Sequence, residues 1–335
     1  MFDCLVSQID CRRGPETREL SRATCEKLAF VRKCSPDLSD RTAVKCPAFE
    51  ARYITRAFKT TSRLERVMIS IVCVYNDERL LADFLLDSLS RQTVHYELIT
   101  IDNTESQFTS AAQALNCGGR NARGDYIMFV HQDIRLRSTE WLHDAEGALD
   151  SLANLGVAGI AGRRGGGCIL ANLTNGTPPT AAGTQIGAEP VAVQTLDECL
   201  TIVPRDVFNV LQFDEVTCDG WHLYAVEYCV SSTLLGFALY VLPFQTYHAS
   251  RGMSSTPTDP VDRLISRCPM AAPAFLPKEY YVALKKVIKK HKNNVSKIHT
   301  VFGDWSTSSP IALQQMTGAM RKIASDILLS LQSDA

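Results

Sequence analysis

The sequence lacks long apolar runs, a secretion-type start and an excess of charge of either sign. No apolar run reaches the roughly 18 to 20 residues that a membrane-spanning helix needs. The opening "MFDCLVSQIDCRRG" has acids where a signal peptide has basic residues, and it has no apolar core. The net charge of -1 gives no global electrostatic case for a nucleic-acid partner. We therefore expect a cytoplasmic protein, or one that is peripheral on the inner face of a membrane, with no nucleic acid as its partner.

Paired cysteines of the C-x-x-C type are also missing, although the chain has 12 cysteines. Their irregular spacing fits no zinc module. Cys73, Cys199 and Cys229 lie inside apolar runs, where cysteine usually acts as a small hydrophobic residue. We expect reduced thiols, and the alternative is a disulfide-bonded or metal-bound N-terminal segment.

What the chain does contain is a regular alternation of buried strands and amphipathic helices that begins near residue 67. The apolar runs "VMISIVCVY", "YELITID", "DYIMFV" and "GVAGIAG" are separated by segments with helical spacing. This order predicts an α/β domain whose central sheet is mainly parallel and flanked by helices.

Polar residues end three of these strands, at Asn76, Asp102 and Asp133. Ligands of such sheets bind beyond the carboxyl ends of the strands, so these residues mark one candidate site. In "FVHQD" the aspartate follows a strand that is apolar throughout. A buried carboxylate is costly unless it is hydrated, hydrogen-bonded or bound to a cation. The alternative is a strand that simply ends in a polar loop.

The composition divides the chain into three parts. Residues 1–66 form a basic extension of unknown role, with 14 Lys and Arg against 9 Asp and Glu. Residues 67–255 carry the α/β pattern, and residues 256–335 form a helical tail. Within the tail, residues 278–297 hold seven Lys against one Glu beside an apolar stripe at Tyr281, Leu284, Val287 and Ile288. This pattern predicts either a solvated charged face or weak contact with an anionic membrane.

An ordered set of motifs within residues 67–255 resembles glycosyltransferase family 2. These motifs are "VCVYNDERLLADFLLDSLSRQ", "YELITIDN", "ALNCGGRNARGDYIMFVHQD", "VQTLDECLTIVPRDVFNVLQFDE", "WHLYAVEYC" and "TYHASRGM". The resemblance implies the A-type glycosyltransferase (GT-A) fold, a Rossmann-like α/β sandwich. It also implies transfer of a sugar from a nucleotide-diphosphate donor, most simply a UDP-sugar, to a hydroxyl of a glycan, lipid-linked or protein-linked acceptor, with Mn²⁺ or Mg²⁺ as the cofactor.

The same resemblance implies roles for individual residues at the donor side of the site. Asp133 stands for the last acid of the family's metal-binding motif, with His131 in place of the first acid. His248 would be a further metal ligand, and its alternative is a buried, hydrogen-bonded histidine. The residues expected to bind the donor nucleotide are Tyr75, Asn76, Glu78, Asp102, Asn103, Arg123 and Arg251.

At the acceptor side, members usually invert the anomeric centre in one displacement, with a helix-borne carboxylate as base. Here Ala225 replaces one acid of the usual pair, and Glu227 stands for the other. We expect Glu227 to be the base, with Asp219 and His222 close enough in sequence to substitute, and the alternative for Glu227 is a helix-surface or structural acid. By the same resemblance, Asp197 and Trp221 would contact the acceptor.

Two other readings stay open at this stage. A protein that binds nucleotide sugars or acts as a scaffold without turnover is favoured by Ala225 and by the reduced acidic motif. A nucleotidylyltransferase is less well supported, because such enzymes carry a glycine-rich loop after the first strand and this chain has "YNDERLL" there.

Overall fold

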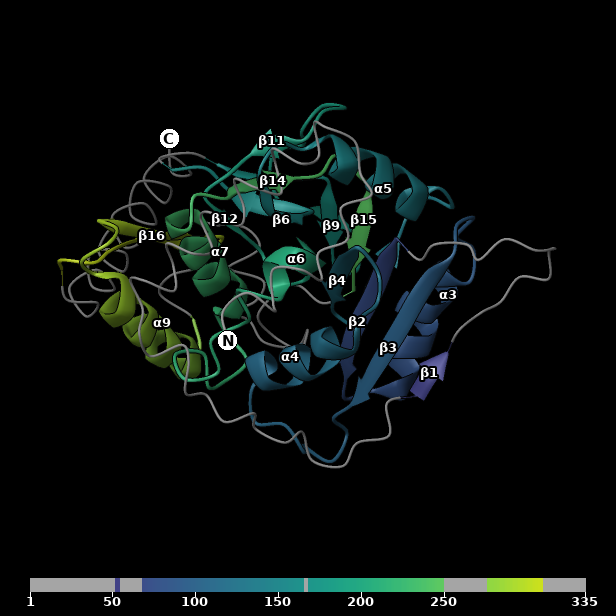
Figure 1. Cartoon of the computed structure of the whole chain (residues 1–335), viewed down its shortest axis with the longest axis horizontal. Helices are drawn as coiled ribbons and strands as arrows, with labels where there is room; N and C mark the ends of the chain where they lie inside the picture. The colour runs from purple at the N-terminus through teal and green to yellow at the C-terminus, as the bar shows by residue number, and fades with distance from the viewer. Residues whose placement is uncertain (1–51, 55–67, 166–167, 250–275, 310–335) are drawn as a thin grey trace, which may run out of the picture. The chain divides into compact units, whose positions relative to one another are not determined.

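A computed structural model describes residues 52–54, 68–165, 168–249 and 276–309 (Figure 1). All of them belong to one compact unit, Glu50–Ala335. Apart from the strand at 52–54, the predicted extension 1–66 lies outside the described residues. The tail is described only between residues 276 and 309.

The core of the molecule is an eight-stranded mixed sheet with the order β1-β3-β2-β4-β13-β6-β14-β11. Five strands run in one direction: β2 (Ile69–Tyr75), β3 (Tyr96–Asp102), β4 (Tyr126–Val130), β6 (Leu155–Gly159) and β14 (Ala238–Val241). Three run against them: β1 (Arg52–Ile54), β11 (Val191–Ala192) and β13 (Leu200–Pro204). The predicted α/β class and mainly parallel sheet are confirmed.

Helices cover both faces of this sheet because its strands are apolar on both sides. Along β2, Ile71 and Cys73 face one layer, whereas Val72 faces the other, as the two-residue period of a strand requires. The first layer contains the helical segment 78–89 and α5 (Trp141–Ser151). The second contains α4 (Ala111–Asn121), which packs so closely on Val72 that only Gly118 fits there.

The helices begin where the sequence offers side-chain caps. Asp77 accepts hydrogen bonds from the backbone N–H groups of Arg79 and Leu80 at 2.9 and 3.0 Å, and it starts α2 (Glu78–Leu80). That helix continues through a π-helical segment, Leu81–Leu86, into α3 (Asp87–Leu89). Ser110 caps α4 in the same way.

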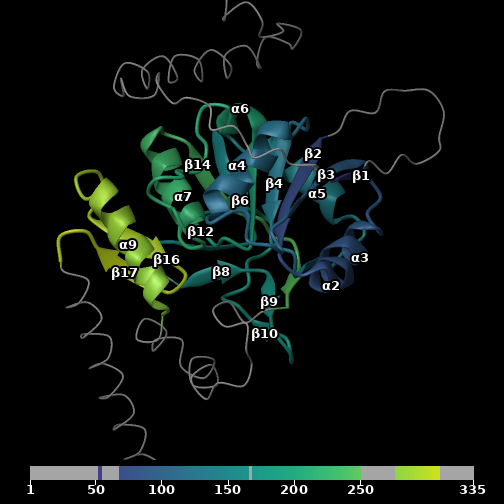
Figure 2. The same cartoon turned by 90° about the horizontal axis from the view of Figure 1, so that it is seen from below.

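Three smaller sheets extend this core (Figure 2). The one that concerns the site has the order β10-β9-β15-β5 and contains β5 (Ile134–Leu136), β9 (Leu173–Asn175), β10 (Thr180–Ala181) and β15 (Thr246–His248). A second contains β7 (Ala161–Arg163), β8 (Ile169–Ala171) and β12 (Thr195–Leu196). A hairpin of β16 (Lys297–Thr300) and β17 (Gly303–Ser306) follows helix α9 (Lys278–His291). The short α6 (Arg205–Phe208) and α7 (Tyr224–Leu234) complete the described helices.

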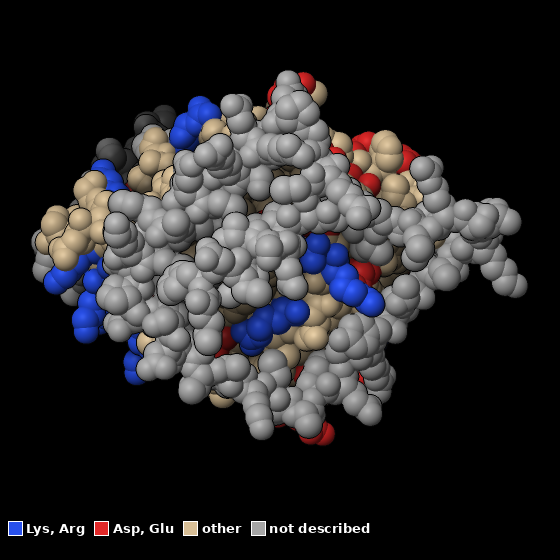
Figure 3. All heavy atoms as spheres, in the orientation of Figure 1, with Lys and Arg blue, Asp and Glu red and all other residues tan. Residues whose placement is uncertain are grey.

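The apolar side of α9 is turned into the protein. Leu284 and Val287 are fully buried, and the Tyr280 ring contacts the rings of His222 and Phe302. Basic side chains remain on the surface at the α9 end of the view in Figure 3. Among the described helices, none has the length and apolar character to cross a membrane. The stripe that suggested membrane contact therefore packs against the rest of the chain.

Candidate functional site

The carboxyl ends of β2 and β4 are tied together by one glutamine. The Gln132 carbonyl oxygen accepts hydrogen bonds from the backbone N–H groups of Asn76 and Asp77, both at 3.0 Å, and its amide donates to the Asn76 side chain at 2.6 Å. The loop after β2 and the loop after β4 are thus held side by side. The residues that follow β2 and β4 therefore lie together at one edge of the sheet, as the strand pattern predicted.

Three potential metal ligands converge beside this edge: His131, Asp133 and His248. One ligand atom from each lies within 4.8 Å of the others. Asp133 and His248 are buried, and the His248 Nε2 atom lies 3.2 Å from the Asp133 Oδ1 atom. The two imidazole rings are 5.7 Å apart between centroids.

Two different sheets supply these ligands. His131 and Asp133 leave the large sheet at the end of β4, whereas His248 ends β15 of the small sheet. β5 joins them, because it follows Asp133 directly and pairs antiparallel with β15, where Ile134 faces His248. The backbone N–H of Ala249 also donates to the Asp133 carbonyl at 3.0 Å. The cluster is fixed by backbone pairing rather than by flexible side chains alone.

The hydrogen bonds of Tyr224 determine which nitrogen of His131 carries the proton. The Tyr224 hydroxyl has a single proton, which it donates to the Glu198 carbonyl at 3.2 Å. Its oxygen lies 3.0 Å from His131 Nε2, and with its own proton on Glu198 it can accept an N–H from that nitrogen. In that tautomer the lone pair of His131 lies on Nδ1, where it is free of Tyr224 and can bind a cation.

Electrostatics differ at the two histidines. Burial and the neighbouring His248 hold the pKa of His131 below its ordinary value, although Asp133 and Asp197 act in the opposite direction. Burial lowers the pKa of His248 too, but its hydrogen bond and charge interaction with Asp133 raise it above the ordinary value. His131 is therefore the more readily neutral imidazole of the pair.

The donor set fits one divalent cation. Ligand atoms about 2.0–2.2 Å from an ion are at most about 4.4 Å apart, so only a small inward movement of the side chains would be needed. Imidazole nitrogen favours the later first-row metals and is tolerated by Mn²⁺, whereas Mg²⁺ strongly prefers oxygen ligands. The sequence predicted Asp133 and His248 as metal ligands, and it offered His131 only as the replacement of the family's first acid.

The predicted nucleotide residues at the ends of β2 and β3 lie at this same edge. Asp102 Oδ1 accepts hydrogen bonds from the backbone N–H and the hydroxyl of Thr104, at 2.9 and 2.7 Å. Asn103 is buried, and its side chain holds the following turn through both polar groups of Phe108. Tyr75 is buried at the end of β2, and its carbonyl accepts from the Asn103 N–H at 2.8 Å. Glu78 is exposed in α2.

Arg123 does not join this site, which corrects the prediction that it approaches the phosphates. Its guanidinium Nε lies 2.7 Å from Glu97 Oε1, and its backbone N–H donates to the same carboxylate. Glu97 is the second residue of β3 and Asp102 is the last, so the two are about 16 Å apart along the strand. Arg123, which is paired with Glu97, therefore lies at the edge opposite Asp102. Arg251, the other predicted phosphate ligand, lies outside the described residues.

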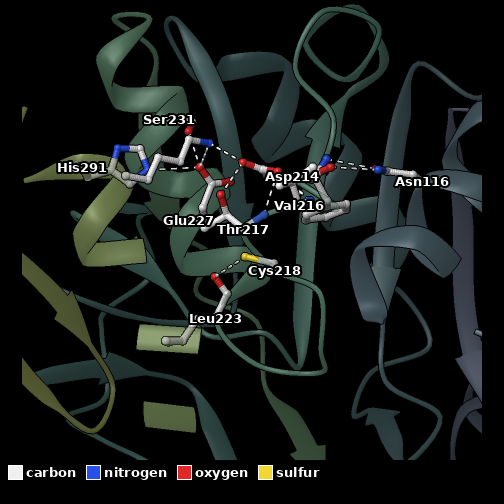
Figure 4. Close-up of polar contacts among 11 residues, drawn as sticks. Asn116, Asp214, Val216, Thr217, Cys218, Leu223, Glu227, Ser231 and His291 are labelled. Carbon is white, nitrogen blue, oxygen red and sulfur yellow. Dashed lines mark hydrogen bonds and ion pairs between the residues drawn. The ribbon is translucent and has the colours of Figure 1, made fainter. Parts of the chain in front are cut away.

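The expected base, Glu227, lies in a closed network between α7 and α9 (Figure 4). Its side chain is 1% exposed and accepts hydrogen bonds from Lys290, from Ser231 at 2.7 Å and from His291 at 3.1 Å. Burial raises the pKa of Glu227, but the bonds from His291 and Lys290 hold it below the ordinary value. Lys290 also binds Asp214 at 2.8 Å.

The remaining predicted residues lie on loops around α7. Asp219 pairs with Lys286 of α9 and is 59% exposed. Trp221 is 43% exposed, as a residue that stacks on a sugar could be. Asp197 Oδ1 accepts the backbone N–H of Cys199 at 3.0 Å, and its charge acts on both His131 and His248. Asp197 was predicted to contact the acceptor, and in the structure it lies close enough to the metal-ligand cluster for its charge to act on both histidines.

Residues 70–249, more than half of the chain, match the model described as "Glycosyltransferase like family". The chain belongs to this family. The predicted resemblance to glycosyltransferases is confirmed, and the mixed sheet between helix layers agrees with the GT-A-type sandwich that it implied.

Other comparisons with this glycosyltransferase-like chain are weaker. No curated protein matches it in sequence. S. aureus TarS 1–349 in complex with UDP-GlcNAc is 17% identical, with 68% of this chain and 73% of that chain covered and a TM-score of 0.40. GalNAc-T7 with UDP, GalNAc and Mn²⁺ is 12% identical, with 68% and 55% covered and a TM-score of 0.42. The family assignment rests on the match over residues 70–249 and not on these likenesses.

Proposed function

We propose that this chain is a metal-dependent glycosyltransferase that uses a nucleotide-diphosphate sugar and inverts the anomeric centre. The observation that supports it is the convergence of His131, Asp133 and His248 at the sheet edge that also carries Asp102. A cation held there would neutralise the diphosphate of a donor and help it to leave. Asp102 would accept hydrogen bonds from the base, which suits the N–H of uracil and favours a UDP-sugar.

The two imidazoles make Mn²⁺ the expected cofactor rather than Mg²⁺. We expect Mn²⁺ to bind at least about 10-fold more tightly than Mg²⁺, because Mg²⁺ gains little from nitrogen ligands. His131→Asp should narrow this difference, since it restores a second carboxylate. His143→Asp, at an exposed position of α5, is the matched control.

The acceptor in this proposal is a hydroxyl of a glycan, a lipid-linked glycan or a protein-linked glycan. Trp221 would stack on its sugar ring. Cytoplasmic location is part of the proposal, and peripheral membrane contact through residues 278–297 would depend mainly on lysines, because most of the apolar side of α9 is buried and only Val282 is exposed.

The test is calorimetric titration of the full chain with UDP, GDP, dTDP and CDP, each with Mn²⁺, with Mg²⁺ and with chelator. We expect UDP to bind with Mn²⁺ and to bind at least 10-fold more weakly with chelator. Asp133→Asn should remove the metal dependence. Equal UDP binding with and without metal would contradict the metal site, and the absence of binding by all four nucleotides would contradict the donor class.

A second candidate is a nucleotide-sugar-binding protein without turnover. It is favoured by Ala225 and by the network that engages Glu227, which together leave α7 without an available acid. Release of UDP from any UDP-sugar would exclude this candidate.

A further inference from the structure

The acid in the first turn of α7 is Glu227, which α9 engages, but another part of the chain supplies a second carboxylate. Ala225 has only a methyl group where the family resemblance places a carboxylate. The N-cap residue Leu223 is left-handed, with φ 64°, and makes no side-chain cap. The backbone N–H groups of Leu223, Tyr224 and Ala225 instead face the carboxylate of Glu198.

Glu198 reaches this position because of the register between β13 and β4. These strands are antiparallel, with Leu200 opposite Val130, and the Cys199 carbonyl accepts the His131 N–H at 3.0 Å. One residue earlier in the chain, Glu198 therefore lies beyond the end of the ladder, on the edge that carries Asp133.

A single hydroxyl links Glu198 to the metal-ligand cluster. Tyr224 donates to the Glu198 carbonyl at 3.2 Å, and its hydroxyl oxygen lies 3.0 Å from His131 Nε2. The main chain of Glu198 is thus fixed relative to His131. The Glu198 carboxylate faces the start of α7, where the family resemblance places the base for the incoming hydroxyl.

One carboxylate oxygen of Glu198 is not used in hydrogen bonding within the described part of the chain. Among the described residues, its Oε1 atom is buried without a hydrogen-bond partner. Burial and the neighbouring charge of Asp197 raise the pKa of Glu198 well above its ordinary value, although the α7 N–H groups lower it. A higher pKa makes the carboxylate a stronger proton acceptor.

We propose that Glu198 is the catalytic base of this chain, in place of the acid that is missing from α7. The inference rests on the proposed glycosyltransferase function. In the reaction, the Glu198 carboxylate takes the proton of the acceptor hydroxyl. The hydroxyl oxygen forms its bond to the anomeric carbon while the bond from that carbon to the diphosphate breaks, and the electron pair leaves with the diphosphate.

The experiment compares Glu198→Gln with wild type in the full chain with Mn²⁺. The probes are UDP-glucose, UDP-galactose, UDP-GlcNAc and UDP-GalNAc, with water as the acceptor and UDP release as the readout. Glutamine can still accept the N–H groups of α7 but cannot take a proton. We expect UDP release to fall at least about 100-fold, with UDP affinity within twofold of wild type.

Two further variants separate a base from a helix cap. Formate should partly restore UDP release in Glu198→Ala, because it supplies the missing carboxylate, and it should have no effect on Glu198→Gln. Asp206→Asn is the control for a lost surface carboxylate, since α6 lies at the opposite edge of the sheet, and it should release UDP at the wild-type rate.

The other possible results for UDP release and UDP binding each exclude a different part of the proposal. Wild-type release by Glu198→Gln would show a cap alone and overturn the proposal, and a selective loss in Glu227→Gln would return the role to α7. A wild-type protein that binds UDP with Mn²⁺ but releases none from any donor would also overturn it, in favour of the binding-protein candidate. Failure to bind UDP at all would instead refute the proposed function itself.

Discussion

At the scale of single residues, the site depends on contacts that are invisible in the strand pattern. Asp133 could be identified from the sequence because it follows a buried strand. The role of His131 could not, because it depends on a tyrosine more than ninety positions away that fixes its proton. Hydrogen bonds of this kind orient metal ligands, and their loss typically weakens metal binding about 10- to 100-fold.

Tyr224→Phe should therefore weaken Mn²⁺ binding about 10-fold, because the His131 Nε2–H loses its acceptor and the ring can turn. Mn²⁺ titration followed by electron paramagnetic resonance measures this directly. The matched control is Tyr228→Phe in the same helix, whose hydroxyl donates to the Leu211 carbonyl at 2.7 Å, away from the cluster. Equal Mn²⁺ affinities for the two variants would contradict the proposed orientation of His131.

Two helical glycines give a paired test of packing. A Cβ atom on Gly119 of α4 would overlap the Phe208 ring, whereas one on Gly147 of α5 would meet nothing within 4 Å. Gly119→Ala should lower the free energy of unfolding by about 1–3 kcal/mol through overpacking. Gly147→Ala should raise it by about 0.5–1 kcal/mol, because alanine loses less backbone entropy in a helix. Urea unfolding followed by circular dichroism measures both free energies of unfolding. If the two variants change it in the same direction, the close packing of α4 on Phe208 is contradicted.

At the scale of elements, α9 is joined to α7 by buried charge rather than by apolar contact alone. Lys290 and His291 both reach Glu227, and Lys290 also pairs with Asp214. Partial burial raises the pKa of Asp214, but hydrogen bonds from Lys290 and Thr217 hold it well below its ordinary value. The sequence showed only that α9 is basic and amphipathic. That pattern fits membrane contact as well as a solvated charged face whose apolar side packs inside the protein.

Asp214→Asn should destabilise the protein by about 1.5–3 kcal/mol at pH 7, the usual contribution of hydrogen bonds to a charged group. Because the folded pKa of Asp214 is lowered, its stabilisation is present above the unfolded pKa of about 3.9 and is lost as the pH falls through the folded value. The difference between wild type and variant should stay constant from pH 7 to 5 and shrink below pH 4. Urea unfolding at pH 7, 5, 4 and 3 measures it, with Asp206→Asn as the exposed control. A pH-independent difference would mean that the charge of Asp214 is not involved.

At the scale of the whole molecule, the fold was more predictable than the site. Apolar runs and helical spacing were sufficient for the sheet, for its helix layers and for the edge where Asn76, Asp102 and Asp133 meet. The strand pattern also places Arg123 at the opposite edge, because Arg123 precedes the strand that Asp133 follows, and Glu97 holds it there. Nothing in the sequence showed that Glu198 lies against α7, since that contact depends on the register between β13 and β4.

The buried face of α9 has a consequence for the molecule as a whole. We expect no more than weak binding to vesicles of phosphatidylserine and phosphatidylcholine at 150 mM NaCl, because α9 exposes one large apolar side chain, Val282, beside its lysines, and salt screens the lysines. Co-sedimentation with the vesicles measures this, and binding at 10 mM NaCl that disappears at 150 mM NaCl would agree with it. Salt-resistant binding that Lys285→Gln and Lys289→Gln weaken would show that α9 does contact membranes.

The division of the proposed metal ligands between two sheets also sets when a cation could first be bound there. A nascent chain that has emerged as far as Asp133 has the end of β4 but not β15, and therefore lacks His248. The complete ligand set forms only after residue 248 has been synthesised and β15 has paired with β5. An ion that needs all three side chains binds the folded chain in preference to any partly made one, so its concentration acts on the last steps of folding by mass action.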